Sequence, residues 1–273
     1  VLKRVFGMRF SVGIFTNLSR DHLDYHGNLA NYISAKTRLF SEVLMADGTA
    51  VLNGDDAYYE TLRNTVMARG IDTLSYGWHG KDLRIDDLRV EAAGQWLELT
   101  VQDTRISIRL PLIGEFQSIN ALCALGIVMA AGADPVDTAP HLEKLVGVRG
   151  RLELAATLPN GAAVYVDYAH TPDALKKVLS AMRSHTKQNI HLVFGCGGER
   201  DIGKRLEMGK IAATCADNVI ITDDNPRTEN AASIRRQVLE ACDSATEIPD
   251  RGEAIFEAIS RLNAGDLLVI AGK

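Results

Sequence analysis

The chain has few cysteines, no excess of positive charge and no long apolar run. Cys123, Cys196, Cys215 and Cys242 form no CxxC pair, so the sequence predicts the reduced thiols of a cytosolic protein. The net charge of −5 gives no support to a nucleic-acid partner. No apolar run is long enough to span a bilayer and no secretory signal opens the chain, so we expect a cytoplasmic protein without a membrane partner.

What is present is a globular composition in 273 residues, enough for two domains with a sizeable core. The sequence begins at Val1 without an initiator Met and stops at Lys273, directly after the strand-like stretch 267–270 and a glycine. A domain rarely ends at a strand tip of that kind. We therefore expect a fragment of a longer protein.

The first half of the chain mixes helices with a region of alternating polarity. Residues 83–110 alternate apolar and polar side chains, which predicts an antiparallel patch with one solvated face. The segment 53–56, Asn-Gly-Asp-Asp, reads as a turn that leads into a helix. The other elements expected here are strands at 11–15 and 49–52 and helices at 29–44, 119–131 and 136–145.

From Val164 onward, apolar strands alternate strictly with helices. This βαβα pattern predicts an α/β fold with a Rossmann-like, doubly wound parallel sheet. A boundary near Val148 would divide the chain into domains 1–147 and 148–273. The expected strands are 162–166, 190–194, 218–221 and 267–270, with a weaker one at 246–248, and the expected helices are 172–185, 203–215, 231–243 and 252–263.

The most informative motif is Thr222-Asp223-Asp224-Asn225-Pro226-Arg227, directly after the apolar run 218–221. It falls at the carboxyl end of a predicted parallel strand, where open α/β sheets bind ligands. Arg227 offers a planar fork suited to a carboxylate, and the side-chain oxygens of Asp224 and Asn225 suit an ammonium group. Together these groups suit a zwitterion such as an amino acid. An ordinary strand-to-helix turn with solvated charges is the alternative.

Two neighbouring stretches near the amino terminus are rich in polar groups. The loop 16–27 carries His22, a second histidine and two carboxylates, a cluster that can hold Mg²⁺ or position a phosphate. Lys36 lies on the mostly apolar helix that follows. A surface lysine is the ordinary interpretation, while a buried neutral lysine can react, including with CO₂.

Two further stretches suit a nucleotide. Phe116 and Asn120 open a predicted helix, where the ring could stack on a base and the amide could read its edge, although Phe116 is equally a core residue. Arg151 lies at the predicted domain boundary, where an arginine can reach a phosphate when domains close. A solvated linker charge is the simpler interpretation of Arg151.

The last two stretches also follow predicted strands. In Val166-Asp167-Tyr168-Ala169-His170-Thr171-Pro172, capping of a helix explains Thr171 and Pro172 but not Asp167 or His170. The loop Gly195-Cys196-Gly197-Gly198 contains three glycines, which let a backbone approach a ligand closely. It partly matches a dinucleotide fingerprint, but its third glycine is displaced and the charged run Glu199-Arg200-Asp201 follows. That composition favours a charged ligand over a nicotinamide dinucleotide.

Six motifs now stand in one order: TNLSRDHLDYHG, SAKTRLF, GRLE, VDYAHTPDAL, FGCGGERDIGKR and DDNPR. Together they resemble the Mur ligase family, in its diaminopimelate-adding type, over almost the whole chain. The resemblance implies the rear part of a central ATPase domain at 1–147 and most of a Rossmann-like carboxyl-terminal domain at 148–273. The nucleotide-sugar domain, the Gly-rich phosphate loop and the carboxyl-terminal end of the family have no counterpart here, so we expect this fragment alone to be inactive.

The resemblance also implies an activity. ATP phosphorylates the carboxylate of UDP-N-acetylmuramoyl-L-alanyl-D-glutamate, and the amine of meso-2,6-diaminopimelate attacks the acyl phosphate, a step in peptidoglycan precursor synthesis. These three small molecules are the expected partners, and a cytoplasmic monomer is the expected form. The implied cofactors are ATP and two Mg²⁺ ions, together with a carbamylated Lys36.

Residue roles follow from the same resemblance. His22 and carbamylated Lys36 are expected to bind Mg²⁺, and Arg4 to contact the UDP-sugar peptide. Asn120 and Phe116 are expected at the adenine, with Arg151, Asp167 and His170 on the nucleotide side of the cleft and Arg151 near the transferred phosphoryl group. The implied amino-acid site consists of Arg200, Asp224, Asn225, Pro226, Arg227 and Gly272.

Two positions depart from the family pattern, and two other functions stay open. Gln117 stands where asparagine is usual, and Arg149 stands where proline is common. An L-lysine-adding or other Mur or folylpolyglutamate-type ligase is one alternative, which the motif at 224–227 tests because lysine lacks the second carboxylate that Arg227 would bind. A nicotinamide-dependent dehydrogenase, suggested only by residues 195–198, is the other.

Overall fold

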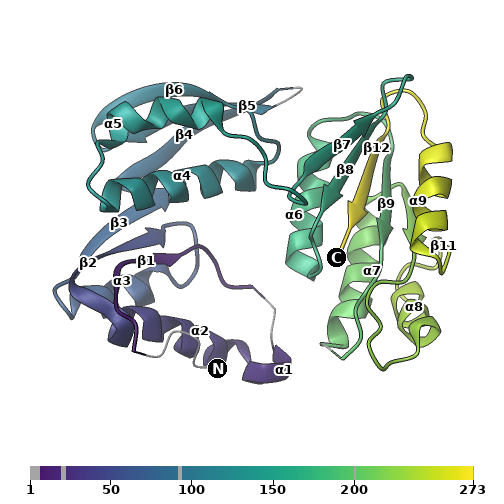
Figure 1. Cartoon of the computed structure of the whole chain (residues 1–273), viewed down its shortest axis with the longest axis horizontal. Coiled ribbons are helices and arrows are strands. Elements are labelled where there is room, and N and C mark those ends of the chain that lie inside the picture. The colour runs from purple at the N-terminus through teal and green to yellow at the C-terminus, as the bar shows by residue number, and fades with distance from the viewer. Residues whose placement is uncertain (1–6, 20–22, 92–93, 200, 273) are drawn as a thin grey trace. The chain divides into compact units, whose positions relative to one another are not determined.

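The structure is a computed structural model that describes residues 7–19, 23–91, 94–199 and 201–272. The chain divides into two compact units. The amino-terminal unit contains residues 7–19 and 26–145, and the carboxyl-terminal unit contains residues 146–272 together with the short segment 23–25. Each unit is built on its own six-stranded sheet (Figure 1).

The amino-terminal sheet has the strand order β1-β2-β3-β4-β5-β6. Strands β1 to β4 pair in parallel, whereas β4, β5 and β6 form an antiparallel meander, as the alternating pattern of residues 83–110 predicts. The strands are Phe10–Phe15 (β1), Leu44–Asn53 (β2), Asp72–Gly77 (β3), Leu83–Glu91 (β4), Gly94–Val101 (β5) and Thr104–Leu110 (β6).

Helices cover this sheet and complete two apolar cores. The helix α4 supplies Ala121, Leu122 and Leu125 to the core under β3 to β6, and α3 supplies Leu62 and Val66 to the core beside β1 and β2. The helical elements before residue 146 are Leu23–His26 (α1), Leu29–Arg38 (α2), Leu39–Val43 (η1), Tyr59–Met67 (α3), Glu115–Ala130 (α4), Pro135–Thr138 (α5) and Ala139–Lys144 (η2).

Two predicted helices of the amino-terminal half lose their α-helical form before their predicted ends. The helix predicted over 29–44 changes at Leu39 into a π-helical turn, where Arg69 donates hydrogen bonds to the carbonyl oxygens of Phe40 and Leu44. The helix predicted over 136–145 is a single α-turn followed by a 3₁₀ segment, because Pro140 has no N–H for an α-helical bond. Strand β3 was not predicted.

The carboxyl-terminal sheet has the strand order β11-β10-β9-β12-β8-β7. Strands β8 to β12 are parallel, which confirms the predicted Rossmann-like sheet, and β7 adds an unpredicted antiparallel edge. The strands are Glu153–Thr157 (β7), Ala163–Asp167 (β8), Ile190–Phe194 (β9), Asn218–Ile221 (β10), Thr246–Glu247 (β11) and Leu267–Ala271 (β12).

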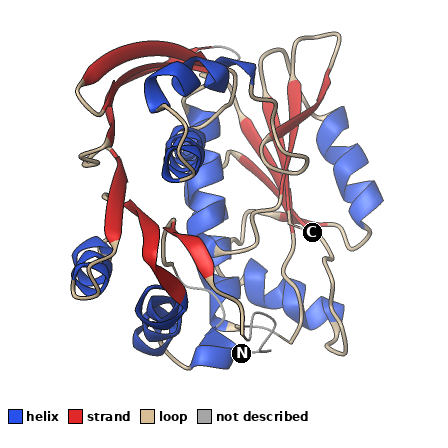
Figure 2. Cartoon of the chain, turned by 60° about the vertical axis from the view of Figure 1, so that its left-hand side comes forward, coloured by secondary structure: helices blue, strands red, loops and turns tan. Residues whose placement is uncertain are grey.

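Helices lie on both faces of this sheet (Figures 1 and 2). Helix α9 packs Ala254 and Ala258 on one face, against Val193 and Leu268. Helices α6, α7 and α8 neighbour one another in that order and cover the other face. The four helices are Pro172–Arg183 (α6), Gly203–Cys215 (α7), Ala231–Leu239 (α8) and Arg251–Ser260 (α9). This doubly wound arrangement sends the loops after β8, β9, β10 and β12 to one edge of the sheet.

At the opposite edge, a buried carboxylate ties the start of β9 to the loop before β12. Asp266, 1% exposed, accepts hydrogen bonds from the backbone N–H groups of Asn189 (3.0 Å) and Asn263 (2.8 Å) and pairs with His191 (3.2 Å). Burial alone would raise the pKa of Asp266, but the two N–H groups and His191 together hold that pKa below its usual range.

Asp266 should therefore make stability depend on acid pH. Its folded-state pKa lies below the unfolded value of about 3.9, so its stabilisation is full above that value and is lost as pH falls through the folded-state pKa. Asp266→Asn cannot accept both N–H bonds, and we expect it to lower the free energy of unfolding by about 2 kcal/mol at pH 7. The free energy of unfolding of this variant should also fall less steeply as the pH is lowered. Urea unfolding between pH 7 and pH 3 measures both effects, with Asp103→Asn on an exposed turn as the control. Equal acid profiles for the Asp266 variant and the wild type would contradict this assignment.

Candidate amino-acid and nucleotide site

The carboxyl edge of the second sheet gathers most of the residues that the sequence singles out. Strands β10, β9, β12 and β8 are consecutive neighbours, so the loops that follow them lie side by side. These loops carry Asp224–Arg227 after β10, Gly195–Glu199 after β9, Gly272 after β12 and Asp167–His170 after β8.

The turn after β10 holds Arg227 in a fixed position. Arg227 has a φ of 52°, a left-handed conformation that is costly for a residue with a side chain. Its Nη1 donates a hydrogen bond to the carbonyl oxygen of Gly198. Within the part of the chain that the structure describes, Nε and Nη2 donate to no other residue. One edge of the guanidinium is thus held by the protein, and the other is open to a carboxylate.

The glycines after β9 serve a purpose that differs from the sequence interpretation. A Cβ atom on Gly198 would overlap the carbonyl oxygen of Pro226, and one on Gly195 would overlap that of Thr222. The N–H group of Gly198 also donates to the carbonyl oxygen of Asn225 (2.9 Å). These two glycines therefore make room for the backbone that follows β10. The sequence analysis had expected a ligand in that space.

Cys196 lies within the same loop, buried beside Met208. Burial raises the pKa of its thiol to about 11, although Lys204 and Arg205 oppose the shift. A thiol with so high a pKa is a poor nucleophile at neutral pH. Cys196 is therefore a packing residue.

Asp224 and Gly272 are neighbours across the strand ends. Gly272 has a φ of 106°, and a Cβ atom there would lie 3.2 Å from Asp224 Oδ2. Arg251, which begins α9, donates from Nη2 to the carbonyl oxygen of Ala271 (3.0 Å). Burial lowers the pKa of Arg251, and the charge of Asp224 partly offsets that shift. The sequence offered no reason to place Arg251 beside this site, because the contact joins segments far apart in the chain.

The loop after β8 brings the nucleotide-side candidates together. The guanidinium of Arg151 lies 4.9 Å from the centre of the Tyr168 ring, and the Tyr168 ring packs edge-on against His170. Asp167 is buried and accepts hydrogen bonds from the N–H groups of Ala169 (2.7 Å) and Leu152 (2.8 Å). Burial raises the pKa of Asp167 against the effect of these two bonds. Asp167 thus shapes the backbone from which Arg151 projects.

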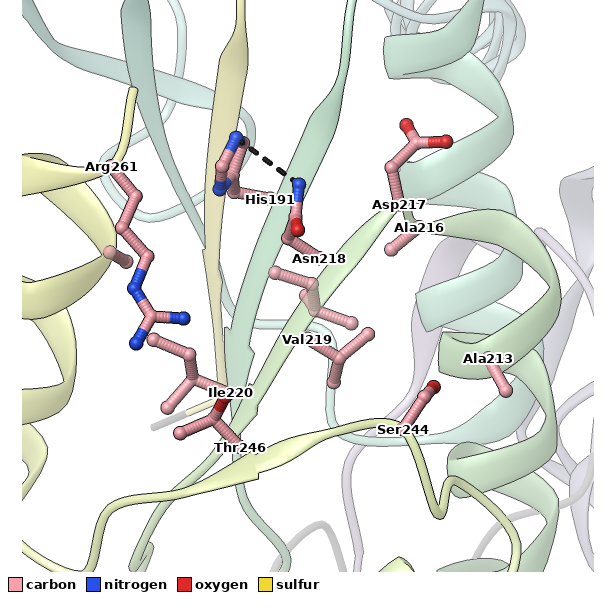
Figure 3. Close-up of a pocket in the computed structure, with 12 residues that line it drawn as sticks. His191, Ala213, Ala216, Asp217, Asn218, Val219, Ile220, Ser244, Thr246 and Arg261 are labelled. Atoms are coloured by element: carbon pink, nitrogen blue, oxygen red, sulfur yellow. Dashed lines mark hydrogen bonds between the residues drawn. The ribbon is translucent and has the colours of Figure 1, made fainter. Parts of the chain in front are cut away.

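A pocket of about 150 Å³ lies at the amino ends of β9 and β10 (Figure 3). Two of its polar side chains are already paired, His191 with Asp266 and Arg261 with Glu257. This pocket is therefore a poorer candidate for a ligand than the carboxyl edge.

In the amino-terminal unit, residues 16–18, which begin the first polar motif, are hydrogen-bonded to side chains at and just after the end of β2. Asn53 donates to the carbonyl oxygen of Thr16 (2.7 Å), and Asp56 accepts from the N–H group of Leu18 (3.1 Å). The predicted turn 53–56 thus has a specific role that the sequence did not reveal. Three predicted site residues, Arg4, His22 and Arg200, lie outside the described residues.

Lys36 projects from α2 toward the end of β1. Its Nζ lies 5.2 Å from the centre of the Tyr32 ring and 5.9 Å from that of the Phe15 ring. Both distances lie within the range of a cation–π contact. Among the residues described, no group of three histidine, cysteine or acidic side chains could hold a metal ion. A Mg²⁺ site here would need His22 and an additional oxygen ligand, which a carbamate on Lys36 would supply.

The adenine candidates lie in the first turns of α4. Phe116 is half-buried and Asn120 is exposed, and a spacing of four residues puts them on one face of the helix. Asn120 donates to the side-chain oxygen of Gln117 (3.3 Å), so the unusual glutamine orients the asparagine. Trp78, which the sequence did not single out, donates to Glu115 (2.8 Å) at the start of the same helix.

Comparison with known proteins identifies the class. The Mur ligase middle domain matches residues 1–128, and the Mur ligase glutamate ligase domain matches residues 150–273. The chain therefore belongs to the Mur ligase family. Within the described part of the chain, no helix has the length and apolarity needed to cross a membrane.

The more particular likeness is to one type within that family. The UDP-N-acetylmuramoyl-L-alanyl-D-glutamate–2,6-diaminopimelate ligase of Zymomonas mobilis is 49% identical over 267 residues, which cover 98% of this chain and 55% of that protein. The ligase of the same name from a Chelativorans species is 46% identical over 271 residues, 99% of this chain and 56% of that protein. The chain thus spans about half the length of these curated relatives.

Solved structures agree on the fold. A structure of a ligase of the same name is 38% identical with a TM-score of 0.61 and covers 96% of this chain and 55% of that one. MurF from Acinetobacter baumannii is 18% identical with a TM-score of 0.78, over 96% of this chain and 56% of its own. This second likeness concerns the fold alone, which confirms the predicted family architecture.

Gly198 gives a direct test of the close packing between the loops after β9 and β10. Gly198→Ala must displace the Pro226 carbonyl, and we expect it to lower the free energy of unfolding by about 2 kcal/mol or more. Gly197→Ala is the matched control, since its Cβ would meet the flexible tip of Arg227 at 3.1 Å and the Asn225 carbonyl oxygen at 3.4 Å, an ordinary contact distance. Urea unfolding of both variants measures the difference, and equal losses would show that the loops do not interlock in this way.

Proposed function

We propose that this chain supplies the central and carboxyl-terminal parts of a ligase that joins meso-2,6-diaminopimelate to UDP-N-acetylmuramoyl-L-alanyl-D-glutamate with the use of ATP. The observation that carries the proposal is the turn after β10, where the open guanidinium edge of Arg227 lies three residues after the carboxylate of Asp224. The relatives at 49% and 46% identity bear the name of this activity and support the choice.

The proposed reaction has two steps. The γ-phosphoryl group of ATP passes to the glutamate carboxylate and ADP leaves. The amine of diaminopimelate then attacks the acyl carbon, phosphate leaves with the bonding electrons, and the amine loses a proton. Mg²⁺, when bound, would neutralise phosphate charge in both steps.

The residues of this chain would bind and orient the reactants. Arg227 would take a carboxylate of diaminopimelate through its open edge, and Asp224 an ammonium group. Arg200, Asn225, Pro226 and Gly272 would complete this amino-acid site. Arg151 would face the transferred phosphoryl group and Arg4 the nucleotide-linked peptide. Asp167 and His170 would border the nucleotide, and Phe116 and Asn120 would contact adenine. The proposed division is a partial central domain at 1–147 and a carboxyl-terminal domain at 148–273.

The metal-binding assignment extends the proposal to His22 and Lys36. Lys36 lies beside Phe15, and carbamylation would turn its ammonium group into an anionic oxygen ligand of the kind that Mg²⁺ prefers. The wider proposal includes a monomeric, cytoplasmic enzyme of peptidoglycan precursor synthesis.

Arg227 should decide which diamino acid is joined. In a full-length ligase carrying these residues, Arg227→Ala should remove the partner of the distal carboxylate, which L-lysine lacks. The preference for diaminopimelate over lysine, measured as the ratio of kcat/KM values, should fall by roughly 30-fold or more, equivalent to about 2 kcal/mol.

Arg236→Ala on the exposed face of α8 is the control for Arg227 and should leave the ratio unchanged. If Arg227→Ala leaves the ratio unchanged as well, Arg227 does not determine the preference for diaminopimelate over lysine. A wild-type ratio that already favours lysine would instead support the lysine-adding alternative.

Lys36 should carry a carbamate in the same full-length ligase. Supplied with ¹³C-bicarbonate, the wild type should give a carbamate resonance in ¹³C NMR that Lys36→Ala lacks. Ligation by Lys36→Ala should be lost, because a ligand of Mg²⁺ is missing. A fully active Lys36→Ala enzyme, or a wild type without the resonance, would refute the carbamate.

A further inference from the structure

The carboxyl edge of the second sheet contains a buried cation that the proposed reaction does not use. Arg205, in the first turn of α7, is 1% exposed. Its guanidinium pairs with Glu229 through two hydrogen bonds, from Nη1 to Oε2 (3.0 Å) and from Nη2 to Oε1 (2.9 Å). Nη1 also donates to Gln237 of α8 (2.7 Å), and Nη2 to the carbonyl oxygen of Gly197 (3.3 Å).

Glu229 extends this contact to the loop after β9. Its carboxylate accepts a hydrogen bond from the N–H group of Glu199, while the neighbouring Thr228 donates to the side chain of Glu199. The bonds from Arg205 and from the Glu199 N–H group hold the pKa of Glu229 below its usual range, so Glu229 is ionised at neutral pH. The ion pair therefore joins α7, α8 and both loops.

The two loops joined in this way are the ones that carry the amino-acid site. Glu229 stands two residues after Arg227, and Gly197 precedes Gly198, whose carbonyl oxygen holds Arg227. A buried guanidinium needs its charged partner because water cannot replace it. Movement of Glu229 away from Arg205 would leave that cation unpaired, so the pair resists any separation of the loops.

We infer that Arg205 and Glu229 are positioning residues for the amino-acid site, whose ion pair fixes Arg227 and Asp224 in the geometry that binds the incoming amino acid. This inference rests on the proposed function for the identity of the substrate. It assigns neither residue to the chemical steps.

Glu229→Gln in a full-length ligase tests the inference. Glutamine can accept from one guanidinium nitrogen but turns an N–H₂ group toward the other and carries no charge. The KM for the amino acid should rise roughly tenfold or more because the binding groups lose their alignment. The KM for ATP and the kcat should change by less than about threefold. Glu229→Asp, which keeps the charge, should recover part of the loss.

Asp266→Asn is the control, because Asp266 is a buried carboxylate that pairs with His191 (3.2 Å) at the opposite edge of the sheet, away from the two loops. It should leave the KM for the amino acid unchanged even if the melting temperature falls. An unchanged KM in Glu229→Gln, or an equal rise in Asp266→Asn, would overturn the positioning role.

Thr228→Val is an additional variant that tests the positioning role while the Arg205–Glu229 ion pair stays intact. Thr228 is exposed, so its loss removes the hydrogen bond to Glu199 without opening the core. The KM for the amino acid should rise by about two- to fivefold. If Glu229→Gln does not fold, an unchanged KM in Thr228→Val overturns the inference.

A panel of amino acids offered to the wild type separates the two proposals. If the wild type joins another amino acid, the proposed substrate is wrong, and the KM of the variants is then measured with the amino acid that is accepted. If the wild type joins diaminopimelate and the variants behave as wild type, only the positioning role fails.

Discussion

Arg205 is a positively charged side chain with 1% of its surface exposed, and the loop arrangement at the carboxyl edge of the second sheet depends on the groups that accept its hydrogen bonds. The acceptors come from three different segments and are Glu229, Gln237 and the carbonyl oxygen of Gly197. The close approach of the loops is possible because Gly195 and Gly198 have no Cβ atoms. The left-handed Arg227 is tolerated within this frame, since both of its neighbouring loops are fixed.

The same edge explains why one sheet could serve two kinds of reactant. Strand β10 ends in Asp224 and Arg227, which suit the two charges of an amino acid, while β8 ends beside Arg151, which suits a phosphate. The order of the strands places β9 and β12 between them. In the proposed reaction, this strand order would give the amine nucleophile and the activated carboxylate separate positions along one line of strand ends.

How much the sequence could predict depended on whether a signal was local. The apolar runs of β8, β9, β10 and β12 and the polar turn 224–227 are continuous in sequence, and the structure has them where they were predicted. Strand β7 was missed because it is an exposed edge strand without a buried alternation. The pairing of Arg205 with Glu229 spans 24 residues and joins two loops, and nothing in the spacing of those residues reveals it. The use of the glycines was misread for the same reason, because their neighbour is another loop.

The central claim is that the turn after β10 receives the amino acid. A structure of the full-length ligase with meso-2,6-diaminopimelate bound tests it most directly. The account predicts a carboxylate of the ligand within hydrogen-bonding distance of Arg227 Nε and Nη2, an ammonium group at Asp224, and Arg205 still paired with Glu229. A ligand bound elsewhere, with Arg227 turned to solvent, would contradict the account.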